Sequence, residues 1–137
     1  NKIAEKYACG FYVKLHPVDS VENYKGLINN TYGEVLDKTT SMEQFENMVD
    51  FSVAHNTSAI IDLIYDEKTV FVYRMEKSFP VITDDIYNFK DIEEFIDKYN
   101  KWNDNKEKYK EEYKNIISLY YTKNSKELHK KFFESLI

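Results

Sequence analysis

Clustered carboxylates are the most prominent groups in this chain that could take part in chemistry or binding. Two acidic pairs, Asp66-Glu67 and Asp84-Asp85, each stand close to a tyrosine. Carboxylates attract a basic partner, and tyrosine supplies contact area at a small loss of conformational entropy. The pattern predicts a partner-binding surface formed by Tyr65, Asp66, Glu67, Asp84, Asp85 and Tyr87.

The same carboxylates, together with Asp62, could instead bind a divalent metal ion for hydrolysis. Such a site needs a lysine near the metal carboxylates, but Tyr73-Arg74-Met75 stands where an acidic-x-Lys triplet would be. The histidines His16, His55 and His129 fall in three separate predicted elements, and HExxH and CxxC motifs are absent. We therefore expect no bound metal ion.

Other catalytic machinery is not indicated either. Cys9 is the single cysteine, and its neighbours give no sign of an activated thiolate. The three glycines are isolated, which excludes a glycine-rich phosphate loop. The sequence thus favours a binding protein without a cofactor over an enzyme. Because one cysteine cannot form an internal disulfide, we expect the chain to fold by packing in a reducing compartment, the cytoplasm.

The charge balance disfavours a nucleic-acid ligand. The chain has 19 basic and 24 acidic residues, and the net charge of -5 has the wrong sign for neutralising phosphates. Lysines and aromatic residues alternate at 98–102 and 108–110, as in single-strand-binding surfaces, but acidic residues stand among them. Arg74 is the one arginine, although arginine is the preferred side chain for base and phosphate recognition. We therefore expect a basic protein as the partner.

The acidic residues are predicted to lie on and near a β-hairpin. Residues 59–66 and 70–76 are two runs rich in β-branched and aromatic side chains around a polar turn. An odd loop length would pair Asp62 with Arg74 across the two strands. Tyr65, Asp66 and Glu67 would then form the tip of this central hairpin.

The remaining segments predict one further strand and several helices. Residues 11–16 alternate and stop at Pro17, which is typical of a strand. Ser20 can cap a short helix, and Ser41 with Gln44 forms a capping-box pattern for a helix that runs to about His55. Apolar residues at helical spacing then predict three C-terminal helices, capped at Asn88 or Asp91, interrupted at 103–105, and restarted at Ser125.

Together these elements predict an α+β fold with a small antiparallel sheet around the central hairpin and a three-helix C-terminal half. The length of 137 residues corresponds to a single domain, 1–137. No run of about 18 apolar residues is present, so we expect no membrane-spanning helix.

The leading hypothesis is a small acidic protein-binding module that inhibits or neutralises a basic macromolecular partner, as immunity proteins and phage-encoded inhibitors do. The alternative is an enzyme or small-ligand-binding protein with a pocket between the hairpin and the helices, where His55 or Asp62 would be the polar group. A third possibility is an accessory subunit that docks through the C-terminal helices around Tyr109 and Tyr113.

Overall fold

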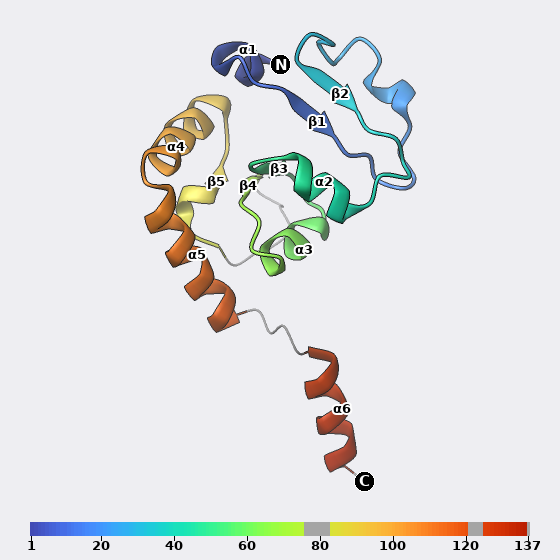
Figure 1. Cartoon of the computed structure of the whole chain (residues 1–137), viewed down its shortest axis with the longest axis vertical. Coiled ribbons are helices and arrows are strands. Elements are labelled where there is room, and N and C mark those ends of the chain that lie inside the picture. The colour runs from blue at the N-terminus through green and yellow to red at the C-terminus, as the bar shows by residue number, and fades with distance from the viewer. Residues whose placement is uncertain (76–82, 121–124, 137) are drawn as a thin grey trace. The chain divides into compact units, whose positions relative to one another are not determined.

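The computed structural model describes residues 1–75, 83–120 and 125–136. The chain forms two compact units, Asn1–Asp50 and Phe51–Ile137, which we call the N-terminal and the C-terminal unit (Figure 1). All residues of the predicted partner-binding surface belong to the C-terminal unit. The single-domain organisation stays a prediction.

The N-terminal unit contains a two-stranded parallel sheet with short helices. Its elements are helix α1 (Lys2–Tyr7), strand β1 (Phe11–Val13), the 3-10 helix η1 (Val21–Tyr24), strand β2 (Gly33–Val35) and helix α2 (Met42–Met48). Phe11 pairs with Gly33, and a Cβ atom at Gly33 would collide with the Phe11 ring and with Ile28. Close approach of this ring to the β2 backbone therefore requires glycine.

In this unit the predicted capping residues are confirmed, whereas the predicted lengths of the elements are wrong. Ser20 accepts a hydrogen bond from the Glu22 backbone nitrogen, and it caps a 3-10 helix rather than an α-helix. The capping box of Ser41 and Gln44 is confirmed. The helix that it starts ends at Met48 instead of His55, because the chain turns extended and forms strand β3 (Ser52–Ala54). The first strand ends at Val13 instead of residue 16.

The C-terminal unit is built on a three-stranded parallel sheet. After β3 come helix α3 (Ala59–Tyr65), strand β4 (Val70–Tyr73), the 3-10 helix η2 (Asp85–Tyr87), strand β5 (Asn88–Phe89) and helices α4 (Ile92–Asp104), α5 (Lys106–Tyr120) and α6 (Ser125–Ser135). The strand order is β3-β4-β5, with Ser52 opposite Val70 and Tyr73 opposite Phe89. Strand β4 is therefore central.

The predicted antiparallel sheet and its central hairpin are wrong. Residues 59–65 form helix α3, and β4 pairs in parallel with β3 and β5. Ile60, Leu63 and Ile64, which follow the helical spacing i, i+3, i+4, are all buried. A short apolar run of β-branched residues cannot be assigned to helix or strand by its composition alone. The cross-strand pairing of Asp62 with Arg74 is lost with the hairpin.

The two faces of β4 pack against different helices. Phe71 contacts aromatic rings of α4, with ring centroids 5.3 Å from Phe95 and 5.7 Å from Trp102. Since alternate side chains of a strand point to opposite faces, Val70 and Val72 point away from α4. Both are fully buried, and α3 lies against β4 with its own buried face. A parallel strand covered on both faces explains the continuous apolar run in β4.

The three C-terminal helices are present as α4, α5 and α6. Asp91, not Asn88, caps α4, because its carboxylate accepts a hydrogen bond from the Glu94 nitrogen at 2.8 Å. Asn88 begins strand β5 instead, and α4 ends at the predicted interruption. Within the described ranges, none of the helices combines the length and the apolar character needed to cross a membrane.

Candidate partner-binding surface

The first acidic pair lies in the turn between α3 and β4. Asp66 is the C-cap of α3, and Glu67 follows with a φ of 59° in the left-handed region. The nitrogens of Glu67 and Lys68 donate to the carbonyls of Ile64 and Leu63, so the turn closes the helix by backbone hydrogen bonds. Both acidic side chains are exposed. They therefore lie at a helix end rather than at a hairpin tip.

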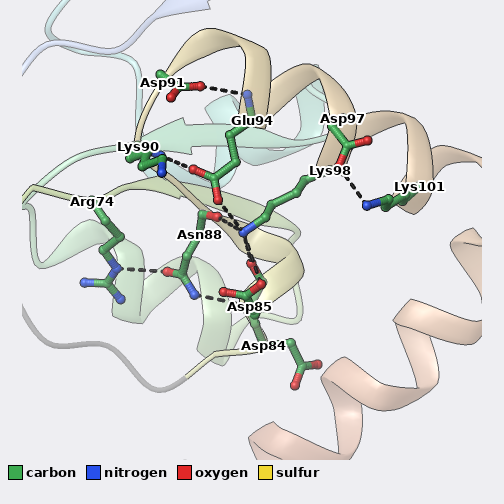
Figure 2. Close-up of polar contacts among 10 residues, drawn as sticks. All are labelled: Arg74, Asp84, Asp85, Asn88, Lys90, Asp91, Glu94, Asp97, Lys98 and Lys101. Atoms are coloured by element: carbon green, nitrogen blue, oxygen red, sulfur yellow. Dashed lines mark hydrogen bonds and ion pairs between the residues drawn. The ribbon is translucent and has the colours of Figure 1, made fainter.

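The second pair lies at the start of η2, and its two members differ. Asp84 is half-buried, whereas the Asp85 carboxylate is 93% exposed. Burial, and in second place the negative charge of Glu112 on α5, raise the pKa of the Asp84 carboxyl. Within the part of the chain that the structure describes, its Oδ2 atom has no hydrogen-bond partner. Figure 2 shows this carboxylate directed away from the neighbouring Lys98 contacts.

Helix α5 contacts both acidic segments. The Tyr113 hydroxyl donates to the carbonyl of Lys68 at 2.9 Å, next to the α3–β4 turn. The preceding residue, Glu112, is the one whose charge acts on Asp84. Glu112 has an ion pair with Lys108, but at 3.9 Å and with both side chains largely exposed this pair neutralises it weakly. A set of four carboxylates, which we call the acidic edge, consists of Asp66, Glu67, Asp84 and Glu112.

Lys98 on α4 holds the η2–β5 segment in place (Figure 2). Its side chain is only 12% exposed. The ammonium group donates to the carbonyls of Asn88 at 2.6 Å and Asp85 at 2.9 Å, and it forms ion pairs with Glu94 and with the Asp85 carboxylate. These contacts connect η2, β5 and α4, and they fix the position of Asp85.

Glu94 completes the start of α4. One carboxylate oxygen accepts from the Lys90 backbone nitrogen at 2.9 Å, and the other pairs with Lys98 at 3.0 Å. The hydrogen bond from Lys98, followed by that from the Lys90 backbone, lowers the pKa of the Glu94 carboxyl. Together with the Asp91 cap, this satisfies the helix N-terminus and anchors it to β5.

Two hydrogen bonds fix the backbone that precedes η2. The Arg74 Nε donates to the Asn88 side-chain oxygen at 2.8 Å, and the Asn88 amide nitrogen donates to the Asp84 carbonyl at 3.1 Å (Figure 2). Arg74, which follows β4, thus supports the backbone of Asp84 through the side chain of Asn88 in β5. These hydrogen bonds hold the backbone of Asp84, whose Oδ2 atom lacks a hydrogen-bond partner among the described residues.

The two tyrosines of the predicted surface are buried or half-buried. Tyr87 is 1% exposed, and its ring lies 5.7 Å from Phe71 and 5.0 Å from Tyr113. Its hydroxyl donates to the Tyr109 carbonyl, and burial strongly raises its pKa. Tyr65 is half-buried in the last turn of α3. In this structure Tyr87 packs beneath the acidic edge rather than on its surface.

Sequence reasoning missed Glu112 and Lys98. Glu112 stands in a run of charges typical of a solvated helix face, and its proximity to Asp84 arises only from tertiary packing. Lys98 carries a local signal, because it follows Glu94 at i, i+4, the spacing of an ion pair on one helix. Its contacts with η2 and β5 have no such local signal.

The residues of the alternative, pocket-based hypothesis are both exposed. Asp62 lies on α3, and His55 follows β3. The His55 Nδ1 atom lies 3.0 Å from the Tyr73 carbonyl, which can only accept a hydrogen bond, so this nitrogen carries the proton. Among the described residues, no three histidine, cysteine or acidic side chains are grouped as metal ligands. No protein family model matches the chain, and neither a curated protein nor a solved structure matches it significantly.

Proposed function

We propose that this chain is a protein-binding module that neutralises a basic macromolecular partner through its acidic edge and the adjacent Asp85. The observation that carries the proposal concerns Asp84. Its Oδ2 atom lacks a hydrogen-bond partner among the described residues, and the negative charge of Glu112 helps to raise the pKa of its carboxyl. Because this oxygen is itself buried, a lysine or arginine of a partner would act on the Asp84 carboxylate as a nearby positive charge that offsets the repulsion from Glu112.

The backbone at Glu67 supports the same interpretation. A residue in the left-handed region after a helix is usually glycine or asparagine, and a larger side chain there costs roughly 1 kcal/mol. Glu67 adopts a φ of 59° and is exposed. Because strained residues concentrate at functional sites, this backbone conformation supports a role for Glu67 in binding.

Electrostatic attraction also suits an inhibitor. Complementary charge accelerates association and selects the correct partner. Enzymes and toxins that act on nucleic acids present basic surfaces to phosphates, and an acidic module can occlude such a surface. We place the interaction in the cytoplasm, where the exposed free thiol of Cys9 would stay reduced.

The experiment begins with affinity capture of the tagged protein from a lysate of its own source cells, with and without nuclease. A stoichiometric basic protein that survives nuclease is the expected partner. Its affinity is then measured for the wild type and for the double variant Asp66→Lys with Glu67→Lys. Because both side chains are exposed, we expect the thermal midpoint to change little and the affinity to fall more than about tenfold.

The matched control is Glu34→Lys with Asp104→Lys, which makes the same change in net charge at exposed positions outside the acidic edge. It should lower the affinity far less than the acidic-edge variant does. Equal losses for the two double variants would show a general effect of net charge and would remove the acidic edge as the binding site. Capture of nucleic acid alone would contradict the proposed function.

A further inference from the structure

The two outer strands of the sheet in the C-terminal unit differ at their edges. The strand order β3-β4-β5 places β3 and β5 on the outside. The edge of β5 is closed by the chain itself, because the Asn88 nitrogen donates to the Asp85 carbonyl and the Asn88 carbonyl accepts from Lys98 at 2.6 Å (Figure 2). These contacts occupy the backbone groups with which a further strand would pair.

Strand β3 presents an open edge. The Ser52 nitrogen donates at 2.9 Å to the carbonyl of Thr69, just before β4, so the backbone groups of Ser52 face β4. Successive residues of a strand direct these groups to opposite sides, so those of Val53 point away from β4. Val53 is 52% exposed, and among the described residues no further strand pairs with β3. Val53 therefore offers a donor and an acceptor to an added strand.

An uncovered edge of this kind is unusual in a native sheet. Proteins generally protect their outer strands by a covering segment, a charged side chain or a proline. Val53, the central residue of β3, is apolar and exposed. Its two backbone groups alone would give an added strand only a modest affinity, since each hydrogen bond contributes no more than about tenfold. Further contacts beside β3 must therefore select the added strand.

The acidic edge begins at the amino end of β3 and can supply such contacts. Thr69, which accepts the hydrogen bond from Ser52, follows Asp66 and Glu67 by three and two residues. Both acidic residues are exposed, whereas the intervening cation, Lys68, is half-buried. A lysine or arginine near the end of an added strand would meet a net negative charge there, and complementary charge selects a partner.

We propose that the basic partner binds the open edge of β3 with an extended segment, which adds as a strand beside Val53 and directs a lysine or arginine toward Asp66 and Glu67. This inference rests on the proposed function, because it names the part of the partner that the same surface receives. In such complexes main-chain hydrogen bonds supply affinity, and the side chains of the added strand supply specificity.

The first test is amide hydrogen exchange of the full chain, with the end-blocked heptapeptide Lys-Thr-Val-Thr-Val-Thr-Lys as the probe. In the free protein we expect faster exchange at Val53 than at Ser52 and Ala54, whose nitrogens face β4. Saturating peptide should slow the exchange of Val53 at least about tenfold and change the other two little. An unchanged Val53, or one already protected in the free protein, would overturn the inference.

The second test is the peptide affinity of two variants at the open edge. Val53→Pro removes the outward N–H group, and proline is tolerated on an edge strand where that group faces solvent. It should weaken peptide binding by about tenfold, whereas Val53→Thr, which keeps the donor, should change it by less than about twofold. Equal affinities of the two variants would overturn strand addition. The exchange measurement on the wild type decides the matter if Val53→Pro does not fold.

The captured partner separates a failure of this inference from a failure of the proposed function. We expect both Val53→Pro and the double variant Asp66→Lys with Glu67→Lys to lower its affinity. A loss in the double variant alone would overturn strand addition and leave the proposed function standing. A loss in Val53→Pro alone would support strand addition, but it would overturn the acidic edge as the binding site and with it the proposed function.

Discussion

At the scale of single residues, the acidic edge contains two features that oppose stability, a partly buried carboxylate and a backbone conformation that favours glycine. Asp84 keeps a carboxylate whose ionised form is disfavoured by burial and by Glu112. Glu67 occupies a backbone conformation that suits glycine. Residues that reduce stability and are nonetheless present are typical of functional sites, because activity and stability make competing demands. Substituting such a residue should therefore change stability in a direction that can be predicted.

The substitution Asp84→Asn should stabilise the protein at neutral pH. A raised pKa in the folded state means that folding favours the protonated carboxyl. The penalty for ionisation is therefore absent below the ordinary pKa of 3.8 and complete above the folded value. We expect a rise in thermal midpoint of roughly 1–3 °C at pH 7. Calorimetric scans at pH 7 and pH 3 measure the effect.

The gain from Asp84→Asn should disappear at pH 3, where the wild-type carboxyl is protonated. The exposed Glu111→Gln on α5 is the control, and it should leave the midpoint at pH 7 close to that of the wild type. An equal or lower midpoint for Asp84→Asn at pH 7 would show that this carboxylate is satisfied in the folded protein.

Lys98 and Lys101 provide a matched pair on α4. Lys98→Met should lower the free energy of unfolding by about 2–3 kcal/mol, because two carbonyls and the Glu94 carboxylate lose a charged donor. In the described part of the chain, the Lys101 ammonium forms an ion pair with Asp97 alone, and its side chain is 60% exposed. Lys101→Met should barely change the stability. Urea unfolding of both variants measures the difference, and similar losses would contradict the role of Lys98.

At the scale of elements, local hydrogen-bonding signals could be predicted from the sequence, and strand pairing could not. The capping box at Ser41 and the cap at Asp91 involve residues three apart, so the sequence alone contains both partners. Parallel pairing of β4 joins residues 18 apart in the pair with β3 and 16 apart in the pair with β5, and nothing in the local pattern specifies it. Residues 59–65 were ambiguous because alternation and helical spacing both fit a short apolar run.

Buried residues three apart distinguish helix α3 from a strand, in which Ile60 and Leu63 would point to opposite faces. Ile60 and Leu63 are both buried, whereas Ile61 is 36% exposed. Ile60→Ala should therefore cost about 2–5 kcal/mol of unfolding free energy, and Ile61→Ala less than about 1 kcal/mol. Leu63→Ala should resemble Ile60→Ala, since both side chains lie on the buried face of the helix. Chemical denaturation measures all three, and a loss at Leu63 as small as that at Ile61 would contradict the helix.

Two glycines test the contact between β1 and β2. A Cβ atom at Gly33 would collide with Phe11 and Ile28, so Gly33→Ala should destabilise the N-terminal unit by about 1–3 kcal/mol. At Gly10 the nearest atom, the Tyr32 carbonyl oxygen, would be 3.6 Å from the added Cβ, an ordinary contact. Gly10→Ala should be neutral or slightly stabilising. Amide hydrogen exchange of β1 and β2 reports the effect, and equal protection in both variants would refute the close approach.

At the scale of the whole molecule, the acidic edge belongs to the C-terminal unit. Its residues come from α5, the α3–β4 turn and the segment before η2. The net charge of -5 indicated an attraction to basic partners but could not reveal that Glu112 lies close enough to Asp84 to raise its pKa. Asp66, Glu67, Asp84 and Asp85 were predicted from their residue types alone, and their role in binding stays a prediction. Glu112 needed the packing of α5, which no local pattern contains.

The most direct test of the acidic edge is the affinity of the captured partner for the wild type, Asp84→Asn and Glu111→Gln, measured by titration calorimetry. The proposed function predicts that Asp84→Asn binds about tenfold more weakly although it melts at a higher temperature, and that Glu111→Gln binds like the wild type. A partner that binds Asp84→Asn as tightly as the wild type would contradict the central role of Asp84.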